Sequence, residues 1–275
     1  MDSETMTKNL ANEVAKDVGN DLAKDLAMVA ALVRRSANEL LRVPGAAIPG
    51  VMAPTIFFVG LTAVFGSLTQ LDGFHADNYQ SFLIPVSLLQ GAGFTGAAAG
   101  VNLARDIEAG MFDRLLASPA PRWVLLAGII LASCLRAMVP ATMLLGVGFA
   151  IGVHWPGIGG LLLAIGMIAA MASVASSWGA LIALHFKTQS AAPLMQAGML
   201  ALILTTSAYA PRELLTGWLH GWAPINPATH IVEAARQGFT EGVSWGGTWP
   251  GLVALAGLLA LLVPLALREM RRTGA

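Results

Sequence analysis

Six long apolar runs constrain this 275-residue chain more than any other feature of its sequence. A helix needs about 20 apolar residues to cross the hydrocarbon core of a bilayer. Only 12% of the residues are charged, whereas a soluble domain carries about 25%. The sequence therefore predicts an all-α, polytopic membrane protein with six transmembrane helices. The predicted spans are residues 46–68, 79–104, 124–153, 157–184, 188–210 and 246–267.

The spans divide the chain into a tail at residues 1–45, a transmembrane domain at 46–267 and a short tail at 268–275. Before the first span, apolar residues recur at three- and four-residue steps and so share one face of a helix. This pattern predicts an amphipathic interfacial helix on the cytoplasmic leaflet that ends at Pro44. The alternative is a solvated tail that packs on a partner. The apolar face comprises Leu22, Leu26, Val29, Val33 and Leu40.

The basic residues predict the orientation. If the first residues are cytoplasmic, all but three of the 16 lysines and arginines fall on the cytoplasmic side. The exceptions are Arg212 and Arg236 on the opposite side and Arg136 within the third span. By the positive-inside rule, the chain is expected in the cell inner membrane with both termini cytoplasmic and in contact with membrane lipids. The formal net charge is zero, which argues against a nucleic acid partner.

Motifs for catalysis and for metal binding are missing from the sequence. None of the four lysines follows a glycine, so no phosphate-binding P-loop is present. There is no His-Glu-x-x-His pair and no Gly-x-Ser-x-Gly nucleophile elbow. We therefore expect no catalytic residue, no metal site and no cofactor bound by this chain.

The densest group of mixed charges lies between the second and third predicted spans, at residues 105–122. Its apolar side chains, Ile107, Phe112, Leu115 and Leu116, predict a short amphipathic helix at the membrane surface. The alternative is a solvated turn with snorkelling arginines. The run RDIEAGMFDRLLASPAPRW resembles the loop after the second span in the ABC type-2 exporter permeases, the family that contains the daunorubicin-resistance permeases. One difference is Met111, where the family commonly has threonine.

The resemblance implies a coupling helix that docks on a separate ABC ATPase, which binds ATP and Mg. It assigns Glu108, Asp113 and Arg114 to that contact, with Arg105 and Asp106 on its flank. It further implies two permease copies or paralogues and two ATPases, working by alternating access at the permease dimer interface. Gly96 and Gly100 form a Gly-x-x-x-Gly motif, which permits the close helix approach that such an interface needs.

The outer loop at residues 211–245 is long and apolar, and its stretch INPATHIVEAARQGFTEG also resembles the family. Asn226 followed by Pro227 is typical of an N-cap and first helical position, and Gly238 suits the far end. We expect a short re-entrant or interfacial helix at residues 228–237, in which Glu233 and Arg236 could pair. The alternative is a tryptophan-rich interfacial anchor.

Arg136 is the only charge inside a predicted span. Either it snorkels toward the cytoplasmic interface, or it faces a hydrated cavity on the substrate path. The function expected from the resemblance is outward transport of an amphipathic drug or lipid-like substrate. The alternatives are export of a lipid-linked glycan and a secondary transporter or channel. An ion-coupled transporter commonly carries a carboxylate inside a span, and these spans contain none.

Overall fold

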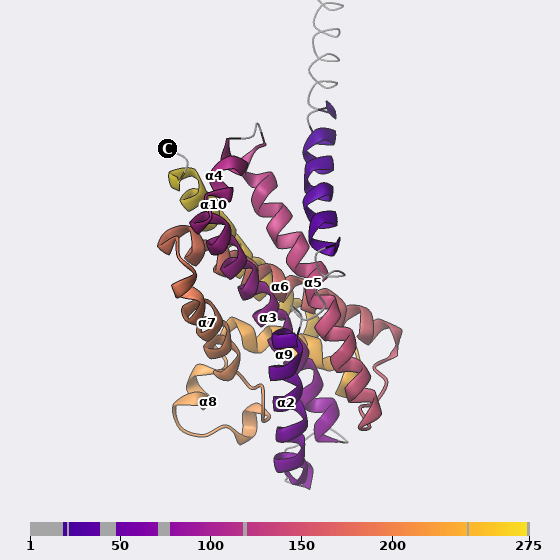
Figure 1. Ribbon diagram of the computed structural model, residues 1–275. Helices are drawn as coiled ribbons and strands as arrows, with labels where there is room; N and C mark the ends of the chain where they lie inside the picture. The colour runs from indigo at the N-terminus through magenta and orange to yellow at the C-terminus, as the bar shows by residue number, and fades with distance from the viewer. Residues whose placement is uncertain are drawn as a thin grey trace, which may run out of the picture.

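The computed structural model describes residues 19–20, 22–38, 48–70, 78–117, 120–240 and 242–273. Every element among them is a helix, so the predicted all-α class is confirmed (Figure 1). Within these described ranges, five helices are long and apolar enough to cross a membrane. They are α2 (Ile48–Phe65, continued by the 3-10 helix η2, Gly66–Gln70), α3 (Tyr79–Glu108), α5 (Arg122–Ala150), α6 (Gly157–Phe186) and α10 (Trp245–Thr273).

The predicted fifth span, residues 188–210, forms a shorter helix than expected. It comprises a 3-10 turn, η3 (Gln189–Ala191), and α7 (Ala192–Leu204). The 13 residues of α7 rise about 20 Å, less than the hydrocarbon thickness of about 30 Å. Residues 205–210 are turns and bends, and they were included in the span because none of them is charged. The absence of charge alone therefore overestimated the length of this helix.

Helix α3 lies at the centre of the bundle and contacts α2, α5, α6, α7 and α9 (Pro227–Thr240). A β-carbon added at Gly96 would lie 2.6 Å from Ala175, and one at Gly100 would lie 2.4 Å from the backbone of Gly179. The glycine motif therefore allows α3 to pack closely against α6 of the same chain, at positions where a larger side chain would clash. The expectation that this motif serves a dimer interface is wrong, because its glycines are already buried against α6.

The two ends of the bundle differ in what they carry. The short helix α4 (Met111–Leu116), the N-terminal helix at residues 22–38 and the end of α10 lie at one end (Figure 1). Helix α8 (Trp218–Trp222) and η2 lie toward the opposite end. The described parts of the chain therefore begin and finish on the same side as α4, as the predicted topology requires.

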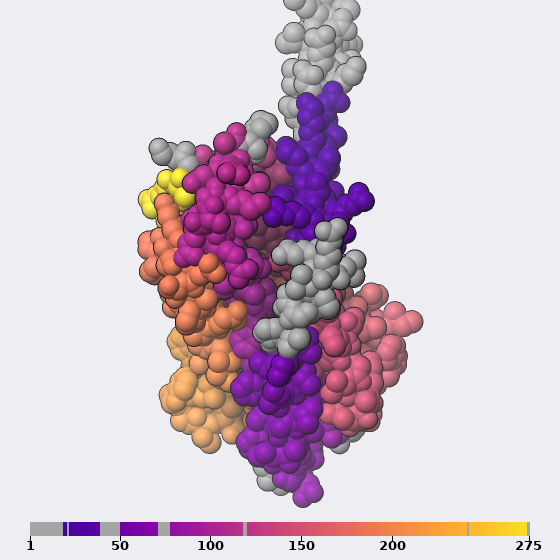
Figure 2. All heavy atoms as spheres, viewed as in Figure 1, coloured from indigo at the N-terminus to yellow at the C-terminus, as the bar shows by residue number. Residues whose placement is uncertain are grey.

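A helix is present at residues 22–38, but only part of its predicted apolar face is covered: Val29 is buried, whereas Leu22 and Leu26 are exposed and Leu40 lies outside the described residues. The contact with α5 comes instead through Leu32, whose side chain occupies the space that a β-carbon at Gly128 would need. The helix stands beside α5 and extends beyond the bundle, rather than lying across the helix ends (Figure 2). The predicted end at Pro44 and the remainder of the tail fall outside the described residues.

Candidate functional site

The predicted coupling loop is built from the end of α3, a glycine and α4. Helix α3 continues beyond the predicted end of the span at residue 104, so Arg105, Asp106 and Glu108 belong to its last turn. Gly110 then adopts a left-handed conformation (φ 68°), which glycine takes without a steric penalty, and α4 follows. The predicted surface helix is therefore shorter than expected, because α3 continues to Glu108 and α4 begins only after Gly110.

Helix α4 has one buried and one charged side. Phe112 is 1% exposed and anchors the helix to the bundle, whereas Asp113 and Arg114 are exposed. Asp113 lies in the first turn and Arg114 in the last, which suits the helix dipole. The two predicted contact residues of α4 are thus presented outward at one end of the molecule.

Glu108 binds another part of the same chain. Its carboxylate accepts hydrogen bonds from Thr188 Oγ1 at 2.7 Å, from the backbone N–H of Gln189 at 2.9 Å and from Gln189 Nε2 at 2.6 Å. Nearby, Arg105 Nε donates to Gln189 Oε1 at 3.3 Å. The end of α3 is therefore tied to the turn before α7. The sequence analysis missed this turn, although Thr188 before a helix is a typical capping signal.

A second tie at this end joins α5 to α10. Arg122 Nη1 donates to the carbonyl oxygens of Met270 at 2.7 Å and Arg271 at 2.8 Å. These carbonyls belong to the last turn of α10, where backbone acceptors lack partners within the helix. A cation at a helix C-terminus also interacts favourably with the helix dipole. Nothing in the sequence pairs Arg122 with residues almost 150 positions away.

Arg136 is half-buried on α5 and faces the N-terminal helix. Its Nη2 donates to Ser36 Oγ at 3.2 Å. It also lines a cavity of about 240 Å³ between the N-terminal helix, α3, α4 and α5. Arg105 and Asp106 line the same cavity, so three of the predicted site residues lie around one space.

At the opposite end, Asn226 joins two helices. Its Oδ1 accepts from the backbone N–H of Ala228 at 2.9 Å, so the predicted N-cap is confirmed, with Pro227 as the first residue of α9. Its Nδ2 donates to the carbonyl of Leu202 at 2.9 Å and to Thr205 Oγ1 at 2.9 Å. Asn226 thereby begins α9 and caps the end of α7, which accounts for the early end of that helix.

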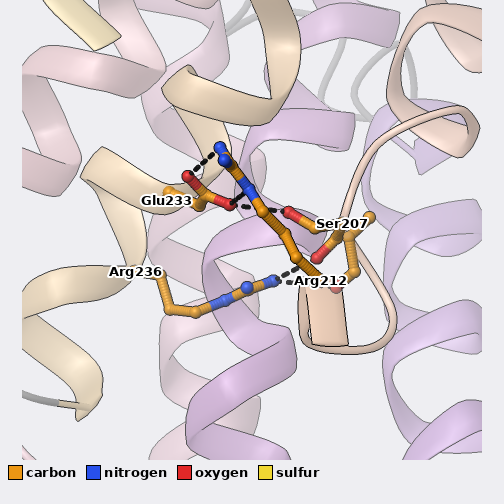
Figure 3. A network of polar contacts seen from close by, with 5 residues as sticks. Ser207, Arg212, Glu233 and Arg236 are labelled. Atoms are coloured by element: carbon orange, nitrogen blue, oxygen red, sulfur yellow. Dashed lines mark hydrogen bonds and ion pairs between the residues drawn. The ribbon is translucent and has the colours of Figure 1, made fainter. Parts of the chain in front are cut away.

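Glu233 and Arg236 on α9 point to different partners (Figure 3). Glu233 pairs with Arg212 of the outer loop, with Nε–Oε1 and Nη2–Oε2 distances of 2.6 Å, and accepts from Ser207 Oγ at 3.0 Å. The sequence suggested a pair within the helix and did not reveal Arg212, because the folded loop brings Arg212 back over α9.

Arg236 is only 7% exposed and donates to backbone carbonyls. Its Nε binds the carbonyl of Phe82 at 3.1 Å, and its Nη2 binds those of Ser207 at 3.1 Å and Ala208 at 2.9 Å. The guanidinium carbon lies 3.5 Å from the centre of the Phe82 ring, a cation–π contact. Arg236 therefore supplies donors to the non-helical segment that follows α7, where backbone acceptors need partners.

Helix α9 extends to Thr240, beyond the predicted end at 237. Gly238 lies inside it, and a β-carbon there would come within 2.4 Å of Gly160 on α6. The expected role of Gly238 as a helix end is wrong, because this glycine permits a close helix crossing. The helix is largely buried against α3, α6 and α10, whereas the tryptophans of the outer loop, Trp218, Trp222 and Trp245, are exposed.

A second cavity, of about 680 Å³, opens beside the Arg212–Glu233 pair, between α9, the start of α10 and the outer loop. Its lining combines Phe82 and Trp249 with His230, Glu213 and both members of the pair. Among the residues that the structure describes, no group of three or more His, Cys, Asp or Glu side chains could hold a metal ion.

Comparison with known proteins identifies the family to which this chain is related. Residues 28–240 match the family of ABC-2 type transporters. The daunorubicin resistance ABC transporter permease protein DrrB1 of Streptomyces coeruleorubidus is 27% identical over 235 residues, which are 82% of this chain and 79% of the relative. The probable doxorubicin resistance ABC transporter permease protein DrrC of Mycobacterium tuberculosis (strain ATCC 25618 / H37Rv) is 25% identical over 244 residues, 87% and 86% of the two chains.

A further relative aligns over a smaller share of both chains. The probable multidrug ABC transporter permease YbhR of Escherichia coli (strain K12) is 27% identical over 187 residues, which are 65% of this chain and 50% of the relative. The family match covers α2 to α9 together with part of the N-terminal helix, and therefore both α4 and the Asn226–Arg236 region. The chain belongs to the ABC-2 type transporter family and is a membrane-spanning permease.

Proposed function

We propose that this chain is the permease subunit of an ATP-driven exporter, with α4 as the docking element for a separate ATPase that binds ATP and Mg. The observation that carries the proposal is the two-sided character of α4. Phe112 holds the helix to the bundle, while Asp113 and Arg114 remain exposed for a partner. Paired charges of opposite sign suit electrostatic recognition of a complementary protein surface.

The same arrangement supports the proposed orientation. The described parts of the chain begin and finish at the α4 end, and the basic residues predict that this end is cytoplasmic (Figure 1). ATP is available on that side of the inner membrane. The exposed tryptophans at the opposite end suit an outer interface, where such side chains act as anchors.

The contacts of Glu108 suggest how docking reaches the transmembrane helices. When α4 moves, it displaces the end of α3, to which it is joined through Gly110. The hydrogen bond from Gln189 to Glu108 then transmits this displacement to the turn before α7. In this proposal two permeases, either identical or paralogous, alternate between inward- and outward-open states. The cargo is an amphipathic drug or lipid-like molecule. The aliphatic spans and the drug-resistance names of the relatives support this cargo.

Co-purification tests the proposal. The tagged permease is coexpressed with a candidate P-loop ATPase from the same genome and extracted in mild detergent. We expect the ATPase to be retained, and Arg114→Glu to reduce its recovery several-fold because the reversed charge repels the docking surface. Arg268→Glu is the matched control, since this exposed arginine lies on α10 at the same end. Equal recovery with Arg114→Glu and the unaltered chain would show that α4 is not the docking element.

A further inference from the structure

The cavity beside Arg136 has an unusual combination of charge and position. It lies between the N-terminal helix, α3, α4 and α5, and its volume is about 240 Å³. Arg35, Arg105 and Arg136 line it, and Asp106 is the single carboxylate among its lining residues. The three arginines come from three different helices, so the fold gathers positive charge that is dispersed in the sequence.

The same cavity is also apolar on one side. Leu32, Leu125 and Ile129 line it together with Phe112 of α4. Asn102 and Ser36 add neutral polar groups, and Ser36 Oγ accepts from Arg136. A ligand that fits this lining has an anionic head and an apolar extension. An amphiphile with a charged headgroup has this chemistry, whereas a small inorganic ion leaves the apolar wall without a partner.

The size of the cavity favours a headgroup over a whole drug. Pockets for drug-sized ligands commonly measure about 300–1,000 Å³, and this cavity lies below that range. Arginine guanidinium groups match phosphate geometry with parallel hydrogen bonds. Basic pockets between transmembrane helices on the cytoplasmic side are suited to phosphate-bearing lipid headgroups.

We propose that this cavity binds the phosphodiester headgroup of an anionic phospholipid from the cytoplasmic leaflet, with Arg35 and Arg105 as the principal ligands and Arg136 at the inner end. The proposal rests on the orientation given under the proposed function. Because Phe112 and Leu115 of α4 form part of the wall, the bound lipid lies directly against the docking element. The N-terminal helix closes the cavity through Leu32 and Gly128.

Lipid binding to the purified full chain tests the proposal without any ATPase. The chain is reconstituted in phosphatidylcholine nanodiscs with increasing phosphatidylglycerol. Its unfolding temperature is measured, and retained lipid is counted by native mass spectrometry. We expect phosphatidylglycerol to raise the unfolding temperature and to be retained. The combined change Arg35→Gln and Arg105→Gln should weaken binding about tenfold or more, since charge-assisted hydrogen bonds are lost.

Arg34→Gln provides the matched control. Arg34 is exposed like its neighbour Arg35 on the same helix, but it does not line the cavity. Its removal lowers the net charge by one, as each of the single changes Arg35→Gln and Arg105→Gln does, and it should leave lipid binding unchanged where each of those weakens it. Arg35→Lys should restore only part of the affinity in the Arg105→Gln background, because an ammonium lacks the planar donor pair.

Three results would overturn the assignment. The first is an equal loss of binding in Arg34→Gln, which indicates attraction by net charge alone. The second is unchanged binding in the double variant. The third is the same thermal shift from inorganic phosphate in pure phosphatidylcholine, which identifies a soluble anion as the ligand. If the double variant does not fold, the two single variants are compared by retained lipid. Loss of ATPase docking with intact lipid binding would instead count against the proposed function alone.

Discussion

Arg212 and Glu233 form a two-point ion pair, in which Nε lies 2.6 Å from Oε1 and Nη2 lies 2.6 Å from Oε2. The pair joins the outer loop to α9, 21 positions farther along the chain. Ser207 donates to the same carboxylate, and Arg236 holds the backbone of Ser207 and Ala208 (Figure 3). One connected network thus fixes the outer loop against α9, beside the larger cavity.

Removing either member of the pair is expected to destabilise the outer end modestly. The two side chains are 36% and 33% exposed, so solvent screens the attraction, and we expect a coupling energy of about 1 kcal/mol between Arg212→Gln and Glu233→Gln. A double-mutant cycle from the unfolding of the detergent-solubilised chain measures it. Glu213→Gln, an exposed neighbour that lines the same cavity, is the control. Strict additivity of the two changes contradicts a working ion pair.

Glu108→Ala is expected to loosen the turn before α7. The carboxylate accepts from Thr188 and twice from Gln189, and alanine removes all three acceptor contacts. Hydrogen exchange at residues 188–191 should become faster, while Glu108→Gln should give a smaller increase because its amide oxygen still accepts. Asp113→Ala on the exposed side of α4 is the control. If exchange at this turn is the same in Glu108→Ala and the unaltered chain, Glu108 does not link α3 to α7.

The sequence predicted the membrane helices well where hydrophobicity alone determines them. Five of the six apolar runs form helices long enough to cross a membrane. The 188–210 run failed because its last residues are uncharged without being helical, and because Asn226, a residue from a later segment, caps α7 at Leu202 and Thr205. Local composition contains no information about a cap supplied from elsewhere in the chain.

The sequence identified several residues of the candidate site, but it did not identify the residues that they contact. The N-cap at Asn226 follows from residue type and spacing, and it was confirmed. The partners of Glu108 and Glu233 were missed, since Gln189 and Arg212 reach them only through tertiary folding. Gly238 was misassigned because a glycine near a helix end serves equally as a terminator or as a crossing point. Only the position of Gly160 distinguishes the two.

The glycine motif of α3 gives a test of the packing. Gly100→Ala is expected to destabilise the bundle by about 1–3 kcal/mol, because its β-carbon would lie 2.4 Å from the backbone of Gly179. Gly146→Ala on α5 is the matched control. It has open space around it and should be neutral or stabilising by up to about 1 kcal/mol, since alanine favours the helix. Thermal unfolding in detergent compares them, and equal effects would refute the close α3–α6 contact.

Thiol labelling in intact cells tests the topology. In a background without Cys134, cysteines at Asp77 and Ser244 should react with a membrane-impermeant reagent, whereas those at Ala109 and Lys187 should react only after permeabilisation. Ser244, Ala109 and Lys187 are exposed in the structure, and Asp77 lies outside the described residues. Labelling of Ala109 in intact cells contradicts the cytoplasmic assignment of the α4 end.

Photo-crosslinking in cells tests whether α4 contacts the ATPase. A photoreactive amino acid is placed at Asp113 on α4 or, as the control, at Trp218 on α8 toward the opposite end. Both positions are exposed, so both probes can reach a partner. If α4 is the docking element, irradiation joins position 113, and not position 218, to a polypeptide that carries a P-loop. The absence of an ATPase adduct from position 113, or its formation from position 218, contradicts docking through α4.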